Sequence, residues 1–295
     1  MEKSVTLDKT PLLMSKVQDY AQLTKMRLAS LVVFSAAMAF LLAPGAVNWN
    51  HFLLLILGGF LVTGASNGFN QIMERDLDKL MTRTANRPLP DGRMSMAEAF
   101  VVSSIMAVAG IFILTFYLNL YSGLLGMAAM MSYVLAYTPL KRVTPLSVFV
   151  GAIPGAIPPM LGWVAATGEL NAGAWILFSV QFMWQFPHFW AIAWVLDDDY
   201  KKAGFIMLPT GGRNKSAAFQ TLVYTISLVI VGLMPFMFHL TGWVSAIIIT
   251  ATAIFFSYRS YLLYREQSIE AARKVMFGSF IYLPVVMIAM VLDKI

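Results

Sequence analysis

The chain has 295 residues, of which 59% are hydrophobic and only 12% are charged, so its composition excludes the soluble globular class. The absence of cysteine from the sequence excludes disulfides, thiolate catalysis and metal centres held by cysteine. A mean hydropathy of +0.71 indicates an integral membrane protein.

Residues 1–26 form a polar segment ahead of the first apolar stretch. Glu2, Asp8 and Asp19 lie in it, which is unlike the composition of a cleavable signal peptide or an acid-poor transit peptide. We therefore expect a cytoplasmic N-terminal segment at 1–26 and a single helical domain at 27–295.

Nine apolar stretches follow, each long enough to cross a bilayer as a helix. They lie at about 28–47, 51–70, 97–117, 120–138, 145–165, 173–196, 217–237, 240–258 and 273–292. This pattern predicts an all-α integral membrane protein with nine transmembrane helices.

The basic residues are sorted to one side of these spans. All of the 21 Lys and Arg residues except Lys294 precede the first span or lie at the connections 2–3, 4–5, 6–7 and 8–9. Because Lys and Arg accumulate in cytoplasmic loops, the N-terminus is predicted to be cytoplasmic, most simply in a bacterial inner membrane. The net charge of +6 then reflects a basic face opposite anionic lipids and requires no nucleic acid.

Three oxygen-bearing side chains recur every fourth residue at the inner end of the second span. Asn70, Glu74 and Asp78 fall within roughly an 80° arc over about 12 Å of helix, with Asn67 on the same arc and Asp76 on the opposite side. Charge is costly at this depth, so the cluster predicts a bound cation or polar ligand.

Two long inner connections, 71–96 and 197–216, carry most of the other acids. Ser95 and Glu98 are typical of a capping box that opens the third span. The simplest interpretation of Glu98, and of Asp76, Asp91 and Asp197, is a solvated carboxylate paired with a nearby basic residue. Functional groups are therefore expected at one face of the molecule.

Carboxylates on one helix with basic residues on neighbouring loops suit a diphosphate bound through Mg²⁺. Magnesium uses one or two carboxylates and takes its remaining ligands from water and phosphate. Arg and Lys would hold the remaining phosphate charge, and an apolar chain attached to the diphosphate would lie between the helices.

Two further spans carry polar or helix-breaking residues. Pro154, Pro158 and Pro159 interrupt the fifth span, so its freed carbonyls require partners in the protein or in a water-lined cavity; close helix packing is the rival explanation. His188 lies about 16 Å along a helix from Asp199, near the middle of the bilayer. It is either a functional residue or a histidine hydrogen-bonded between helices.

Several segments together resemble one known family. Residues 70–78 and 83–90 look like the first aspartate-rich motif of the intramembrane aromatic prenyltransferase superfamily. Residues 137–144, 184–190, 198–204 and 207–209 make the chain most similar, within that superfamily, to the protoheme IX farnesyltransferases, or heme O synthases. The resemblance extends from about residue 23 to the last span.

The resemblance implies nine helices around a central cavity and Mg²⁺-dependent transfer of a farnesyl group. The donor is farnesyl diphosphate and the acceptor is a vinyl group of heme b, which is a substrate and not a permanent cofactor. The products are heme O and diphosphate. The implied catalytic residues are Asn70, Glu74, Asp78, Asp198 and Asp199, and all of these except Asp198 are implied metal ligands.

The second acidic motif departs from the superfamily pattern, because Val195 stands four residues before Asp199 and Trp194 four before Asp198. The resemblance assigns diphosphate binding to Arg83, Arg87, Lys141 and Arg142, and heme binding to His188 and Trp184. Lys25 and Arg27 are weaker candidates for the diphosphate. The positive-inside bias is the competing explanation for every one of these cations.

Two alternatives remain open from the sequence. One is a quinone or chlorophyll prenyltransferase of the same superfamily, which the His188 segment disfavours. The other is an ion-coupled transporter that uses the same acids, although we find no inverted repeat. Membrane lipid is an expected partner, and a heme A synthase or oxidase assembly factor is a further one.

Overall fold

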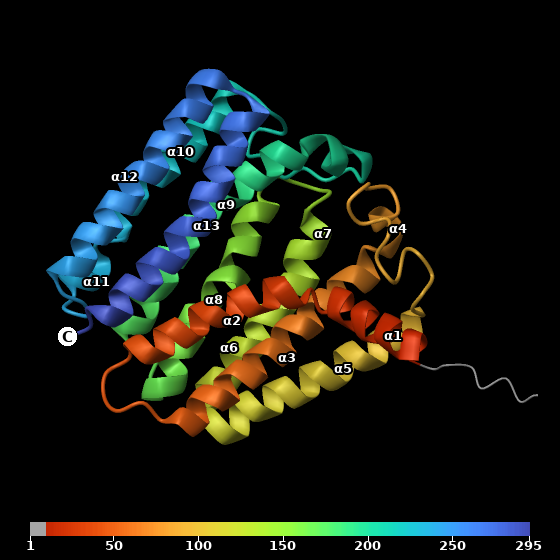
Figure 1. The fold of residues 1–295 in the computed structure, drawn as a ribbon, viewed down its shortest axis with the longest axis horizontal. Coiled ribbons are helices and arrows are strands. Elements are labelled where there is room, and N and C mark those ends of the chain that lie inside the picture. Colours follow the sequence, from red (N-terminus) through yellow and green to blue (C-terminus); the bar gives the residue numbers. More distant parts are fainter. Residues whose placement is uncertain (1–9) are drawn as a thin grey trace, which may run out of the picture.

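The computed structural model describes residues 10–295, which fold into a flat bundle of long helices (Figure 1). Two short segments are π-helical, η1 (Ile113–Leu118) and η2 (Ser132–Tyr137). The only β-type pairing within the described residues is a bridge between Thr241 and Lys294, so the all-α prediction is confirmed. The α-helices are α1 (Thr10–Leu23), α2 (Met26–Leu42), α3 (Trp49–Met73), α4 (Arg75–Asp78), α5 (Met96–Phe112), α6 (Leu120–Met131), α7 (Thr138–Leu140), α8 (Ser147–Thr167), α9 (Ala172–Lys202), α10 (Lys215–Val231), α11 (Met234–Met237), α12 (Trp243–Glu266) and α13 (Ile269–Leu292).

The apolar helices confirm a multi-pass membrane protein. In the described part of the chain, seven helices are long and apolar enough to span a bilayer, or eight if α1 and α2, bent by 50°, count as one span. Helix α9 has 31 residues but is not among them, because Gln181, Gln185 and His188 dilute its apolar character. The ninth span and the orientation of the N-terminus remain predictions.

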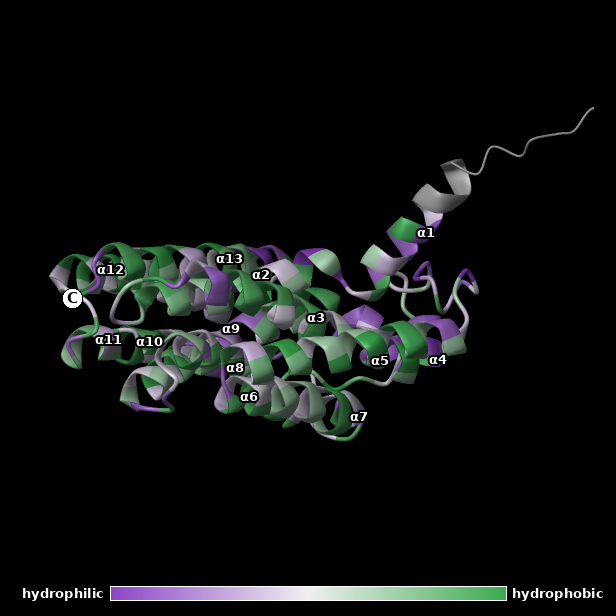
Figure 2. Cartoon of the chain, turned by 90° about the horizontal axis from the view of Figure 1, so that it is seen from below, coloured by the Kyte–Doolittle hydropathy of each residue, from purple (hydrophilic) through white to green (hydrophobic). Residues whose placement is uncertain are grey.

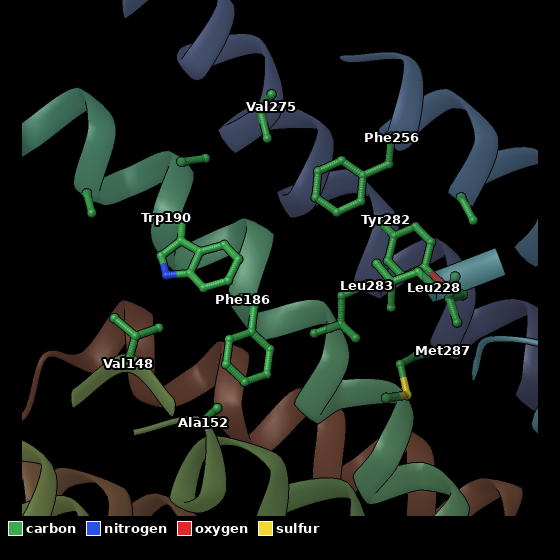
Figure 3. Close-up of a cluster of buried hydrophobic side chains, with 14 of the residues drawn as sticks. Val148, Ala152, Phe186, Trp190, Leu228, Phe256, Val275, Tyr282, Leu283 and Met287 are labelled. Atoms are coloured by element: carbon green, nitrogen blue, oxygen red, sulfur yellow. The ribbon is translucent and has the colours of Figure 1, made fainter. Parts of the chain in front are cut away.

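Hydrophobic residues cover the long helices, and hydrophilic residues gather around α1, α4 and the neighbouring loops (Figure 2). Aromatic side chains of α9, α12 and α13 fill the core at the other end, where Phe186, Trp190, Phe256 and Tyr282 are buried together (Figure 3). An open apolar groove of about 600 Å³ lies along α11 and α12, away from α4. The central cavity expected from the resemblance remains a prediction.

Helix α8 shows how the proline-rich span is stabilised. Pro159 has no N–H to donate to the carbonyl of Gly155, four residues earlier. That carbonyl instead accepts a hydrogen bond of 2.8 Å from Gln181 Nε2 on α9, and Gln185 Nε2 donates to the Ala152 carbonyl at 2.9 Å. A Cβ at Gly155 would overlap the side-chain oxygen of Gln185, so α8 and α9 approach closely here. The prolines of α8 are therefore accommodated in both of the ways considered from the sequence: the freed Gly155 carbonyl has a partner in the protein, and α8 packs closely against α9.

Replacing Gln181 by Leu tests this contact. The Gly155 carbonyl would be left without a donor inside the membrane, which costs about 1–3 kcal/mol. We expect a clearly lower thermal unfolding temperature in detergent, whereas Gln220→Leu on α10, where no such carbonyl bond is described, should leave it nearly unchanged. Equal unfolding temperatures for both variants would show that the Gln181 bond does not stabilise α8.

Candidate active site

Asn70, Glu74 and Asp78, here called the stripe, remain on one face although the helix is interrupted between α3 and α4. Helix α3 ends at Met73, and Glu74 adopts a non-helical backbone with φ −97° and ψ 7° before α4 begins. The backbone bonds Glu74 N–H to Asn70 O (3.0 Å) and Asp78 N–H to Glu74 O (2.7 Å) nevertheless keep the four-residue register. All three residues are at least 95% buried, so the predicted common face exists and is shielded from solvent.

Each member of the stripe contacts a cation from another part of the chain. The Lys141 ammonium lies 2.8 Å from Glu74 Oε1, and Arg87 Nη1 lies 2.6 Å from Asp78 Oδ2. Lys25 Nζ donates to Asn70 Oδ1 at 3.1 Å. Two carboxylates and three basic side chains therefore share one largely buried site, in which a charge left unpaired would be costly.

The segment before Lys141 orients the stripe. Asn70 Nδ2 donates to Thr138 Oγ1 at 3.2 Å, and the Thr138 hydroxyl donates to the Tyr133 carbonyl at 2.9 Å. The Lys141 ammonium lies 4.7 Å from the centre of the Tyr137 ring, within the range of a cation–π contact. These residues follow or belong to the π-helical segment η2, a distortion that often accompanies functional sites. Thr138 was not identified from the sequence, although it lies in the motif that contains Lys141.

A clamp between α3 and the α1–α2 break places Lys25. Asn67 Nδ2 donates to the Thr24 carbonyl at 3.0 Å, and Gln71 Nε2 donates to the carbonyls of Gln22 and Leu23 at 2.9 and 2.7 Å. Lys25 itself has a φ of 47°, a left-handed conformation that is uncommon for a residue other than glycine. The clamp therefore gives Lys25, which the sequence indicated only weakly, a defined place beside Asn70.

The donor set of the stripe fits Mg²⁺. Asp78 Oδ1 is buried and has no hydrogen-bond partner within residues 10–295. Burial raises the pKa of Asp78, and the charge of Arg87 opposes that rise. No cluster of three or more His, Cys, Asp or Glu side chains suitable for a metal occurs among the described residues, but magnesium needs only one or two carboxylates.

Asp199 connects the end of α9 to the loop that follows α4. Its carboxylate accepts hydrogen bonds from the backbone N–H groups of Thr82 (2.9 Å) and Arg83 (3.3 Å) and from Lys202 Nζ (2.9 Å). Burial raises the pKa of Asp199, but these donors outweigh it and lower the pKa to about 2. The contact orders the loop that carries Arg83, and a direct metal contact by Asp199 remains a prediction.

The other acids near the end of α9 lie apart from the stripe. Asp198 has a side chain that is 74% exposed and pairs with Arg213 at 3.0 Å. Asp197, predicted to be solvated, is instead buried, because Lys201 at 2.6 Å compensates its charge. The solvated interpretation is therefore wrong for Asp197.

The remaining predicted cations are less buried. Arg83 is exposed and its guanidinium lies 5.1 Å from the centre of the Tyr200 ring, while Arg142 is also exposed. The structure thus brings Lys141 and Arg87 to the stripe and leaves Arg83 and Arg142 at the surface.

Three acids pair with basic residues as predicted: Asp76 with Arg75 and Lys79, Asp91 with Arg93, and Glu98 with Lys16.

His188 is hydrogen-bonded between helices, as one of the two sequence interpretations stated. Its Nδ1 lies 2.8 Å from Ser279 Oγ on α13, and its ring stacks on Trp184 with a centroid distance of 4.4 Å. The Trp184 indole N–H donates to the Ser279 carbonyl at 3.0 Å. A heme-binding role for the two residues remains a prediction.

Sequence comparison identifies relatives over almost the whole chain. The UbiA prenyltransferase family matches residues 31–283. A protoheme IX farnesyltransferase of Cytophaga hutchinsonii is 49% identical, over 95% of this chain and 99% of that protein. A protoheme IX farnesyltransferase of Christiangramia forsetii is 48% identical, over 95% of this chain and 94% of that protein.

The fold is similar to solved structures of low sequence identity. One, described as digeranylgeranylglyceryl phosphate synthase, has a TM-score of 0.79 at 21% identity and covers 95% of this chain and 98% of that one. Another is a UbiA homologue of Archaeoglobus fulgidus bound to GPP and Mg²⁺, with a TM-score of 0.68 at 16% identity, covering 92% and 99%. At these identities the likeness concerns the fold.

A comparison of a single with a double variant tests the buried pair of Glu74 and Lys141. Lys141→Met alone would leave a buried carboxylate unpaired, at a cost of about 3–5 kcal/mol, whereas Lys141→Met with Glu74→Gln removes both charges. We expect the single variant to unfold at a lower temperature than the double variant. Arg142→Met, one residue further on and exposed, is the control. A single variant as stable as the double one would contradict the pairing.

Proposed function

This chain belongs to the UbiA prenyltransferase family, and from that premise we propose that it transfers a farnesyl group from farnesyl diphosphate to a vinyl group of heme b, giving heme O and diphosphate. One observation carries the proposal: a relative described as protoheme IX farnesyltransferase shares 49% identity over 95% of the chain. These names specify a heme acceptor, and they favour it over the quinone acceptor and the transport role considered from the sequence.

We assign the diphosphate to the stripe and its cations. Asn70, Glu74 and Asp78 would hold Mg²⁺, with Asp199 as a further ligand, and the bound ion supplies positive charge to the leaving diphosphate. The unpartnered Asp78 Oδ1 supports this assignment, as does a UbiA homologue whose structure contains GPP and Mg²⁺. Asp198 is exposed, and its ion pair with Arg213 would help to hold the end of α9 in place beside the site.

Lys141 and Arg87 could bind the substrate diphosphate in place of the carboxylates. Lys141 and Arg87 neutralise the two buried carboxylates at 2.8 and 2.6 Å, and a diphosphate beside them would offer stronger acceptors. If Glu74 and Asp78 hold Mg²⁺, both side chains would be free to bind the phosphate oxygens. Lys25 adds a third cation, and Arg83 and Arg142 lie at the entrance.

The transfer requires little from the protein beyond charge and shielding. The C–O bond of farnesyl diphosphate breaks, its electron pair leaves with the diphosphate, and the vinyl group of heme b attacks C1 of the allylic cation. Water adds to the resulting heme-side cation and loses a proton, leaving a hydroxyethylfarnesyl side chain. Lys141 and Arg87 would stabilise the departing charge, and the buried ring of Tyr137 lies 4.7 Å from the Lys141 ammonium.

His188 and Trp184 would bind heme b as the acceptor substrate. A neutral imidazole is a common axial ligand of heme iron, and the aromatic side chains around it suit a porphyrin. The site would open to the cytoplasmic side of a bacterial inner membrane, in contact with membrane lipid. A heme A synthase or an oxidase assembly factor is the protein partner that we expect for this chain.

The activity is tested with membranes that contain the protein, incubated with heme b, farnesyl diphosphate and Mg²⁺. We expect heme O by chromatography and mass spectrometry. Glu74→Gln and Asp78→Asn should each lower the rate by at least about 10²-fold, because each weakens stabilisation of the leaving charge. Asp76→Asn, on the exposed side of α4, should retain near-normal activity.

Two results would count against the proposal in different ways. Failure to form heme O, in an assay that detects it with an active relative, would overturn the reaction. Near-normal activity of both Glu74→Gln and Asp78→Asn would overturn the metal site while leaving the reaction intact. Prenylation of an aromatic quinone precursor in place of heme b would identify the sister activity.

A further inference from the structure

The hydroxyl of Ser279 on α13 lies within hydrogen-bond distance of two groups, the carbonyl of Met276 and the ring of His188. The Ser279 hydroxyl lies 2.6 Å from the carbonyl oxygen of Met276. A carbonyl has no hydrogen, so the single hydroxyl hydrogen of Ser279 must lie between these two oxygens. The same hydroxyl lies 2.8 Å from His188 Nδ1 and can therefore only accept there. This arrangement favours the neutral imidazole that carries its hydrogen on Nδ1 and its lone pair on Nε2.

The orientation of the imidazole is fixed by the same serine and by Trp184. The indole N–H of Trp184 donates to the Ser279 carbonyl at 3.0 Å, and the indole ring stacks on the imidazole at 4.4 Å with an angle of 21° between the planes. Phe189 and Phe280 approach edge-on, with centroid distances of 5.4 and 5.3 Å. Ser279 is fully buried and supplies the polar contact described for this ring.

We propose that Ser279 is a positioning residue for the heme acceptor: it holds His188 in the Nδ1–H form and so presents Nε2 to the iron of heme b. This rests on the proposed function, which makes heme b the substrate. A histidine that ligates a metal almost always donates its other ring N–H to an acceptor that fixes its tautomer and orientation. The last helix of the bundle thereby takes part in acceptor binding, although it carries none of the charged residues of the stripe.

The inference is tested by heme binding, measured without turnover. Purified full-length protein in detergent is titrated with ferric heme b, and the Soret band is recorded for the wild type and each variant. Ser279→Ala removes the acceptor, and we expect about tenfold weaker binding with a shifted Soret band. Ser279→Thr keeps the hydroxyl and should retain the wild-type heme affinity and Soret band. His188→Ala should lose the Soret band that depends on ligation of the iron by His188.

The matched control is Ser245→Ala on α12, a serine as fully buried as Ser279 whose hydroxyl likewise donates to a carbonyl three residues earlier, that of Gly242 at 2.9 Å. It should bind heme like the wild type, so a general effect of losing a buried hydroxyl is separated from loss of this one. Ser279→Cys keeps the shape of the side chain but is a weak acceptor, and it should weaken binding even if Ser279→Ala does not fold. Thermal unfolding of each variant checks the fold.

Wild-type affinity and an unchanged Soret band in Ser279→Ala or Ser279→Cys would overturn the positioning role. An unchanged band in His188→Ala would overturn it as well, because the iron would then have another ligand. Heme O formation by the same wild-type preparation is scored separately, so failure of the positioning role is distinguishable from failure of the proposed reaction.

Discussion

Two buried ion pairs, Glu74 with Lys141 and Asp78 with Arg87, are the constraint on which the arrangement of this end of the molecule depends. An unpaired charge in such surroundings costs several kcal/mol, so each carboxylate must be met by a cation from another segment. The first pair joins the end of α3 to the segment after α7, and the second folds the loop after α4 back onto that helix. Residues suited to bind a charged substrate thus also hold the fold together.

Polar side chains connect the remaining helices in the same manner. Gln181 and Gln185 link α9 to the proline-broken helix α8, Asp199 links α9 to the loop after α4, and Ser279 links α13 to α9. The bonds of Gln181, Gln185 and Ser279 lie within the membrane-spanning part of the bundle, where water does not compete, so they fix which helices meet and in what register. Helix α9 therefore connects the proposed diphosphate-binding end with the proposed heme-binding region.

Spacing and composition were sufficient to predict the local features. The four-residue register of Asn70, Glu74 and Asp78 follows from helix geometry and persists across the break at Glu74. Contacts between distant segments could not be read from the sequence. Lys25 reaches Asn70 only because Asn67 and Gln71 hold a left-handed turn. The Asp197–Lys201 pair is a local contact between residues four apart on α9, but the burial of Asp197 depends on how that end of the helix packs. The polar residues of α9 likewise make its membrane span hard to count from hydropathy.

The most direct test of the account is an experimental structure with Mg²⁺ and a non-reactive farnesyl diphosphate analogue. The account predicts a metal about 2.0–2.1 Å from oxygens of Asp78 and Glu74. It also predicts that the Lys141 and Arg87 side chains have moved from the carboxylates to the phosphate oxygens. A diphosphate bound elsewhere, with both buried ion pairs intact, would contradict it.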